Sequence, residues 1–227
     1  MVHHHDALHE GAPGHVGVDV AGREGVLSSI AAALGDRSRH TTLPIEREYH
    51  VSGQLDATRR RELLKDRLLD YRAHVVECER DNLGTVVNDL LVTHGSNSLA
   101  APHDIPTDWL SSVSRDVHFD EPSLSVTDLD SIDSTLSGCA VAVAQTGTIV
   151  LDSGERQGRR ALSLIPDHLI IVIFDDQIVE LVPEAVARLT PTSTQTWISG
   201  PSATSDIELE RIEGVHGPRT LDVILVI

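Results

Sequence analysis

The pattern of apolar and polar residues along this chain changes near residue 72. Before that point, apolar residues recur at helical spacing in residues 23–34, ending at Gly35, and again in residues 56–71. After it, short apolar runs alternate with helical patterns, as in strands joined by crossover helices. The sequence therefore predicts an α/β protein with an open, mostly parallel sheet and helices on both of its faces.

The apolar runs at residues 168–174 and 221–227 give the strongest strand signals. Further strands are predicted at residues 75–76, 139–144 and 148–151, and residues 96–101 are at best a weak strand. Helices are predicted at residues 82–93, within 126–136, and at 158–164 and 183–189.

Three regions are expected along the chain. Residues 1–20 are polar, include His3-His4-His5 and have no apolar period, which predicts a disordered leader rather than a metal site. Residues 21–71 are expected to form a helical segment packed on the domain, and residues 72–227 the α/β domain itself.

The net negative charge of the chain limits which kinds of partner it can bind. Acidic residues outnumber basic ones by 35 to 18, and the resulting formal charge of -17 repels nucleic acid and anionic membrane surfaces. No apolar run approaches the roughly 20 residues that span a bilayer, and no signal peptide is visible, so a cytoplasmic protein is expected. A small anionic metabolite remains possible where arginine and backbone amides gather locally.

The two cysteines, Cys78 and Cys139, lie in apolar strand-like runs and are expected to be buried, reduced thiols. Two thiols are too few for an iron–sulfur cluster, which normally takes about four ligands. We therefore expect no cofactor and no metal on this chain.

The first candidate loop is Thr146-Gly147-Thr148, between two apolar strands. Its hydroxyls and amides are placed to bind a ligand at a strand end, although the spacing alone favours a plain hairpin turn.

The second candidate loop begins at Gly200 and runs through Ser202, Thr204, Ser205 and Asp206. These residues have N-cap character, which predicts either an anion site at a helix N-terminus or an ordinary cap.

The third candidate loop contains His216, Gly217 and Arg219 just before the last strand. His216 is suited to proton transfer and Arg219 to clamping a carboxylate, unless Arg219 simply pairs with a nearby acidic residue. We expect the three loops to converge at one edge of the sheet, because parallel strands deliver their carboxyl-terminal loops to one side. No Walker loop, dinucleotide fingerprint, nucleophile elbow or zinc-protease motif accompanies them.

The ordered combination of several segments resembles the LUD domain of the lactate-utilisation protein C family. The segments are residues 144–153, 157–162, 182–185, 198–208 and 213–219. The resemblance implies a three-layer, Rossmann-like fold similar to that of sugar-phosphate isomerases and coenzyme A transferases. It also implies a role in oxidising L-lactate to pyruvate together with partner proteins that carry iron–sulfur clusters.

Three functional hypotheses follow. The first is a substrate-handling or accessory component of a lactate-oxidising system, with Arg219 on the carboxylate and His216 accepting the hydroxyl proton. The second is a non-catalytic interaction or regulatory module that keeps an old ligand pocket. The third, by analogy of fold, is an isomerase or acyl-transfer enzyme acting on a small anionic metabolite.

Overall fold

The computed structural model describes residues 20–35, 48–204, 212–213 and 217–227. The chain divides into two compact units, residues 1–48 and residues 49–227. The first contains the helix α1 (Val20–Leu34), and the second contains every other element. The predicted segment 21–71 is thus divided between the units, and the packing of its first part on the domain stays a prediction.

The second unit is built around a parallel six-stranded sheet with the order β1-β12-β7-β4-β2-β3. Its strands are β1 (His74–Cys78), β2 (Ser98–Ala101), β3 (Asp116–Phe119), β4 (Ser134–Ser137), β7 (His168–Phe174) and β12 (Thr220–Val226). The central strands β7 and β12 are nearly continuous apolar runs, as strands covered on both faces require. The predicted parallel α/β fold is confirmed.

A second sheet with the order β8-β5-β6-β9 was not anticipated from the sequence. It combines one parallel pair with two antiparallel pairs. Its strands are β5 (Val141–Val143), β6 (Thr148–Leu151), β8 (Ile178–Val179) and β9 (Thr196–Ile198), and a short pair, β10 (Ala203–Thr204) with β11 (Ile212–Glu213), lies apart from both sheets.

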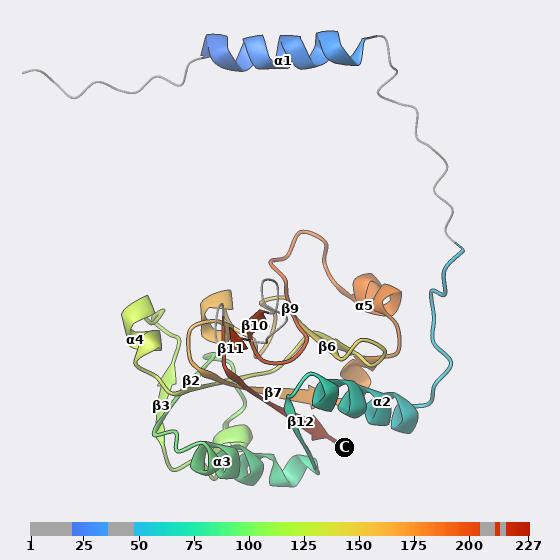
Figure 1. The fold of residues 1–227 in the computed structure, drawn as a ribbon. Coiled ribbons are helices and arrows are strands. Elements are labelled where there is room, and N and C mark those ends of the chain that lie inside the picture. The colour runs from blue at the N-terminus through green and yellow to red at the C-terminus, as the bar shows by residue number, and fades with distance from the viewer. Residues whose placement is uncertain (1–19, 36–47, 205–211, 214–216) are drawn as a thin grey trace, which may run out of the picture. The chain divides into compact units, whose positions relative to one another are not determined.

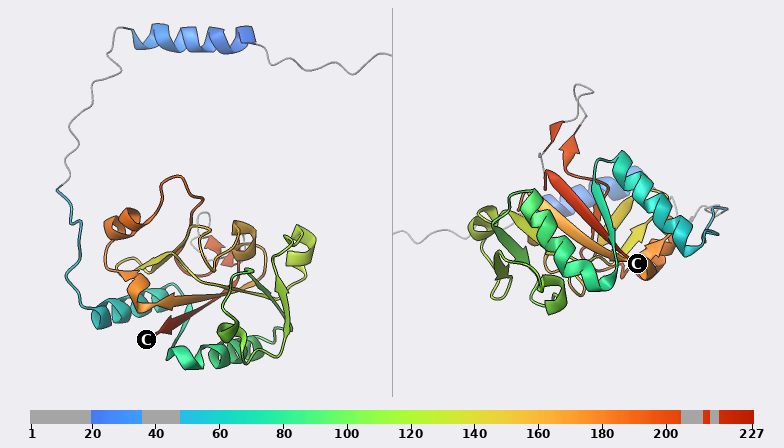
Figure 2. Two further views of the ribbon diagram at one scale, coloured as in Figure 1. Left: turned by 180° about the vertical axis from the view of Figure 1, so that it is seen from behind. Right: turned by 90° about the horizontal axis from the view of Figure 1, so that it is seen from below.

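Apolar packing joins these parts into layers. On one face of the six-stranded sheet, the helix α3 (Leu83–Thr93) buries Val87 and Leu91 against β7 and β12. On the other face, the second sheet and α2 (Ala57–Asp70), through Leu64 and Leu68, cover the same two strands. Figure 1 shows α3 and the second sheet on opposite sides, and the right-hand view of Figure 2 shows α2 and α3 flanking β1 and β12.

Two smaller helices complete the layers. The helix α5 (Val182–Arg188) packs on the outside of the second sheet through Ala185. The helix α4 (Val126–Asp130) and the 3₁₀ turn Arg160–Ser163 cover β2 through Leu129 and Leu162. The remaining 3₁₀ turns are Arg80–Asn82, Thr107–Leu110 and Asp175–Gln177.

Local predictions failed in one region of the sheet. The helix expected within residues 126–136 ends at Asp130, and Ser134–Ser137 form β4 between β2 and β7. Three of the four β4 residues carry hydroxyls, yet all four are fully buried. Because the segment is polar, its sequence did not indicate a strand of the core. Residues 98–101, expected to be weak, form β2 inside the sheet.

The helix predicted at residues 158–164 is reduced to the 3₁₀ turn Arg160–Ser163. Cys78 and Cys139 are both buried and free, as predicted, and burial raises the pKa of each thiol. Within the described ranges, no helix is both long and apolar enough to cross a membrane.

Candidate functional site

Polar side chains gather at the amino edge of the six-stranded sheet. His74, Ser134 and His168 are the first residues of β1, β4 and β7, and Asp222 is the third residue of β12. The register pairs His74 with Asp222 and Ser134 with His168. Since alternate residues of a strand share a face, these side chains all point to the face covered by α3.

The carboxylate of Asp222 is the centre of this cluster. Its Oδ1 lies 2.8 Å from His74 Nδ1, and its Oδ2 lies 2.7 Å from His168 Nε2. His94, the C-cap of α3, places its Nε2 2.9 Å from the same Oδ2. The rings of His94 and His168 are in contact, with centroids 4.3 Å apart.

The Asp222 side chain is fully buried, and this burial alone would raise its pKa. Hydrogen bonds from His168 and His74 and the charges of His168 and His94 outweigh the burial, so the pKa of Asp222 lies below its usual value. The cluster is therefore organised around an ionised carboxylate.

Two serines extend the cluster away from Asp222. Ser134 Oγ lies 2.8 Å from His168 Nδ1 and donates to Ser96 Oγ at 2.6 Å. Both ring nitrogens of His168 therefore have partners, which fixes the orientation of a side chain that is only 5% exposed.

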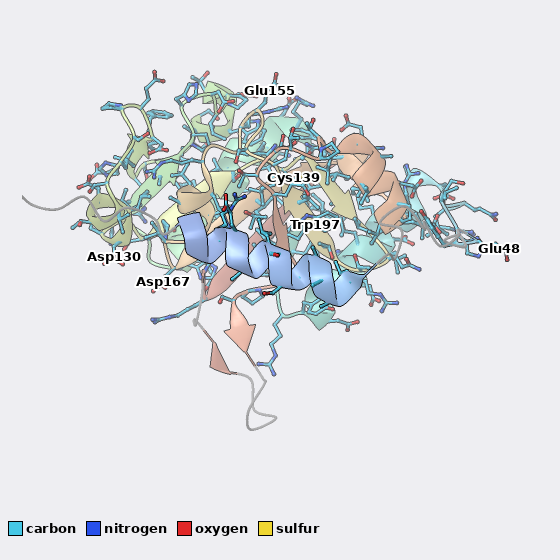
Figure 3. The ribbon with its side chains drawn as sticks, turned by 90° about the horizontal axis from the view of Figure 1, so that it is seen from above. Glu48, Asp130, Cys139, Glu155, Asp167 and Trp197 are labelled. Carbon is cyan, nitrogen blue, oxygen red and sulfur yellow. The ribbon has the colours of Figure 1, made fainter. Side chains whose placement is uncertain are left out.

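A cavity of about 430 Å³ opens beside the cluster, and we call it the amino-edge cavity. Its lining includes His94, Ser96 and His168, which belong to the cluster, and also Arg219. Asp130, Asp133 and Asp167 also line it, and Figure 3 labels Asp130 and Asp167 on the same side of the molecule.

Two of these three carboxylates already have partners. Asp133 accepts hydrogen bonds from the backbone of Asn97 and Ser98, and the Asn97 bond is the main reason why the pKa of Asp133 is lowered. Asp167 Oδ1 lies 3.6 Å from Arg219 Nε in a pair that is about two-thirds exposed. Arg219 is thus neither buried nor held tightly, and its guanidinium is available to a ligand in the cavity.

The residues predicted in the second and third loops meet elsewhere. Gly200, Ser202 and Gly217 line a second cavity of about 330 Å³, together with Arg160. The backbone N–H of Ser202 donates to Pro218 O at 2.8 Å, which joins the two loops. We call this space the glycine-loop cavity.

The first predicted loop is a hairpin turn between β5 and β6. Thr148 Oγ1 contacts Thr146 Oγ1 at 2.8 Å and Ser199 Oγ at 2.9 Å, which links the hairpin to the loop that carries Gly200. Gly147 has a φ of 60° and packs closely on Arg67 of α2. None of the three residues lines either of the two cavities.

The remaining predicted site residues divide as follows. Thr204 lies on β10, whereas Ser205, Asp206 and His216 fall outside the described residues. Among the predicted site residues that the structure describes, Arg219 alone lines the amino-edge cavity. Both cavities lie at the amino ends of β7 and β12, whereas we expected the carboxyl edge.

Sequence reasoning missed His74, His94, Ser96, Ser134, His168 and Asp222. The available signal was an isolated acidic residue, Asp222, in an otherwise apolar strand, because a buried carboxylate must be paired. His168 at the start of the most apolar strand was a similar signal. Both residues lie in strands and belong to no motif, so a search of the loops does not find them.

This arrangement can bind a proton or a cation at the Asp222 carboxylate and a carboxylate at Arg219. One ligand atom from each of His94, His168 and Asp222 lies within 4.8 Å of the others, so the three together could hold a metal ion. His94 also offers an imidazole to the cavity, which is suited to proton transfer.

Comparison with known proteins identifies the family of the chain. The LUD domain model matches residues 62–226. A lactate utilization protein C from Deinococcus radiodurans is 44% identical, with 88% of this chain and 93% of that protein covered, and one from Exiguobacterium is 29% identical, with 91% and 96% covered. A crystal structure of a DUF162 family protein from Deinococcus radiodurans matches with a TM-score of 0.66 at 41% identity, covering 76% of this chain and 99% of that one. This chain belongs to the LUD domain family.

Proposed function

We propose that this protein takes part in lactate utilisation and binds L-lactate in the amino-edge cavity. The observation that carries the proposal is the meeting of Arg219 and the His94–Asp222–His168 cluster at one cavity. Lactate offers two groups that match them, a carboxylate for the guanidinium and a hydroxyl for the cluster. Similarity to proteins named lactate utilization protein C supports this choice among small carboxylates.

The chemistry of lactate gives each residue a role in the proposal. Conversion of lactate to pyruvate removes two electrons and two protons. Arg219 holds the carboxylate, and His94 accepts the hydroxyl proton while the ionised Asp222 stabilises the imidazolium that forms. This assignment moves the proton-accepting role that the sequence suggested for His216 to His94.

The Cα–H bond of lactate also breaks: its proton is released to solvent, and the two electrons need an acceptor outside the described site. We infer that iron–sulfur proteins of the same system accept them, because Cys78 and Cys139 are too few for a cluster. In this assignment the chain handles the substrate, and its partners carry out the electron transfer.

Calorimetric titration of the purified protein with L-lactate tests the proposal. We expect saturable binding, and we expect Arg219→Ala to weaken it by about 1.5–3 kcal/mol, the range for hydrogen bonds to charged groups. Arg188→Ala is a matched control, because Arg188 donates to Asp176 O and lines neither cavity. Absence of lactate binding, or equal binding by both variants, would contradict the proposed site.

Reconstitution tests the proposed partners. Lactate-dependent reduction of iron–sulfur partner proteins should require this chain, and His94→Ala should slow the reduction more than it weakens lactate binding. If lactate binds but the partners are reduced equally well without this chain, the assignment as a substrate-handling component is wrong.

A further inference from the structure

We propose that His94, His168 and Asp222 bind a divalent transition-metal ion of the Zn²⁺ type at the amino-edge cavity. The cluster is the one used in the proposed function, but this inference does not depend on lactate as the ligand. The sequence predicted no metal on this chain, because these three residues are far apart in the sequence and match no spacing motif.

The three donor atoms lie close enough together to share one metal ion. His168 Nε2 and His94 Nε2 lie 2.7 Å and 2.9 Å from Asp222 Oδ2. A tetrahedral ion with bonds of about 2.0–2.2 Å to nitrogen and oxygen holds neighbouring donors roughly 3.3–3.6 Å apart, so these atoms would have to separate by about 0.5 Å to admit it. The contact of His94 with Oδ2 is an ion pair without the alignment of a hydrogen bond, unlike that of His168. Small shifts would thus open room for an ion.

Hydrogen bonds behind the ligands have the pattern found around metal centres. Ser134 Oγ donates to Ser96, so it is left to accept from the Nδ1–H of His168. His168 Nε2 then lies 2.7 Å from the ionised Asp222 carboxylate, and either a proton on Nε2 or a metal ion supplies the positive charge between the two atoms. His74 fixes the other oxygen of Asp222. Such outer contacts orient ligands and raise their basicity.

The surroundings of the cluster favour positive charge. Among the described residues, the carboxylates of Asp130, Asp133 and Asp167 line the cavity together with the guanidinium of Arg219. His94 caps the carboxyl end of the 11-residue helix α3, where the helix dipole also attracts a cation. A bound divalent ion would offset this negative field and make the cavity more receptive to an anion.

The donor set selects the class of ion. Two imidazoles and one carboxylate suit zinc and related transition metals, whereas magnesium and calcium prefer oxygen ligands. Three protein ligands beside an open cavity leave a coordination position for water or a substrate oxygen, as in catalytic zinc sites. With the ion bound, His94 is a ligand rather than a proton acceptor, and the ion lowers the pKa of the bound hydroxyl or water.

Metal titration without lactate tests the inference. The full chain should carry His3→Ala, His4→Ala and His5→Ala, so that the histidine run does not bind the probe. After treatment with a chelator, we expect one equivalent of Zn²⁺ to bind in calorimetry, and Co²⁺ to produce a visible absorption band. Binding should weaken at acidic pH, because protons compete with the metal for its imidazole and carboxylate ligands.

Variants then locate the ion. We expect His94→Ala, at a partly exposed position, to weaken Zn²⁺ binding at least about tenfold without loss of the folded state. His103→Ala is the matched control, because His103 is an exposed histidine outside the cluster. Asp222→Asn provides a second ligand variant that keeps the shape of the side chain.

The outcomes separate this inference from the proposed function. Lack of stoichiometric Zn²⁺ binding, or equal affinity in His94→Ala and His103→Ala, overturns the metal site even if lactate binds. Metal binding that depends on His94 and Asp222 supports it even if lactate does not bind.

Discussion

The amino-edge cavity and the glycine-loop cavity flank the same strand ends but are built from different kinds of residues. His168 lines the amino-edge cavity and pairs with Asp222 in the cluster, on the face covered by α3. Their neighbours Leu169 and Leu221 line the glycine-loop cavity, on the opposite face. Alternation along a strand therefore sends adjacent residues of β7 and β12 into two different environments.

The difference shows that a visible motif and a chemical site need not coincide. At Gly200, with a φ of 86°, an added Cβ would lie 2.6 Å from Tyr71 O, so this glycine serves a close approach of two backbones. The amino-edge cavity has no comparable motif, and its chemistry comes from single polar residues set into apolar strands.

Loss of the central carboxylate should have the largest effect on stability. We expect Asp222→Ala to lower the free energy of unfolding by about 3–5 kcal/mol, because it leaves the buried Nε2 of His168 without its charged partner. Denaturant unfolding measures the change, with Asp130→Ala, on the exposed rim, as the control. Similar losses in both variants would show that the cluster does not organise this edge.

Close packing at the hairpin should have the next largest effect. Gly147 and Gly95 have similar φ values of 60° and 66°, but an added Cβ would lie 2.7 Å from Arg67 Cβ at Gly147 and would meet nothing within 4 Å at Gly95. We expect Gly147→Ala to cost about 2 kcal/mol or more and Gly95→Ala about 1 kcal/mol, measured by denaturant unfolding. Equal losses of unfolding free energy in the two variants would show that Gly147 is needed for its backbone conformation alone and not for its close packing on Arg67.

Acid should lower the stability of the folded protein by protonating Asp222. We expect this effect to be smaller than those of the Asp222→Ala and Gly147→Ala substitutions. The pKa of Asp222 is lowered in the folded state, because its histidine contacts outweigh its burial, so the stabilisation is present above the unfolded value of about 3.9 and is lost as the pH falls through the folded value. Unfolding of the wild type should therefore depend on pH more steeply than that of Asp222→Asn in this window. Parallel curves for the two proteins would contradict the assignment of an ionised Asp222.

Removal of the leader should have the smallest effect. Deletion through Gly17 removes a polar segment with no apolar period, so we expect the melting temperature to change by less than about 4 °C. A larger decrease would show that the leader packs on another part of the protein.

Hydrophobic periodicity was sufficient to predict the class of fold. The continuous apolar runs of β7 and β12 require cover on both faces, and the amphipathic patterns of α2 and α3 provide it. These features depend on residues that are neighbours in the sequence, which is why they can be predicted from it. The burial of Cys78 and Cys139 followed from the same apolar runs.

Only the tertiary structure decided where the polar residues meet. Ser134–Ser137 have little strand signal, and their place between β2 and β7 depends on the cover provided by neighbouring strands. His74, His94, His168 and Asp222 become neighbours because the strand order places β1, β12 and β7 side by side and α3 ends beside them. The strand order is set by pairing between distant segments, and no local pattern of residues encodes it.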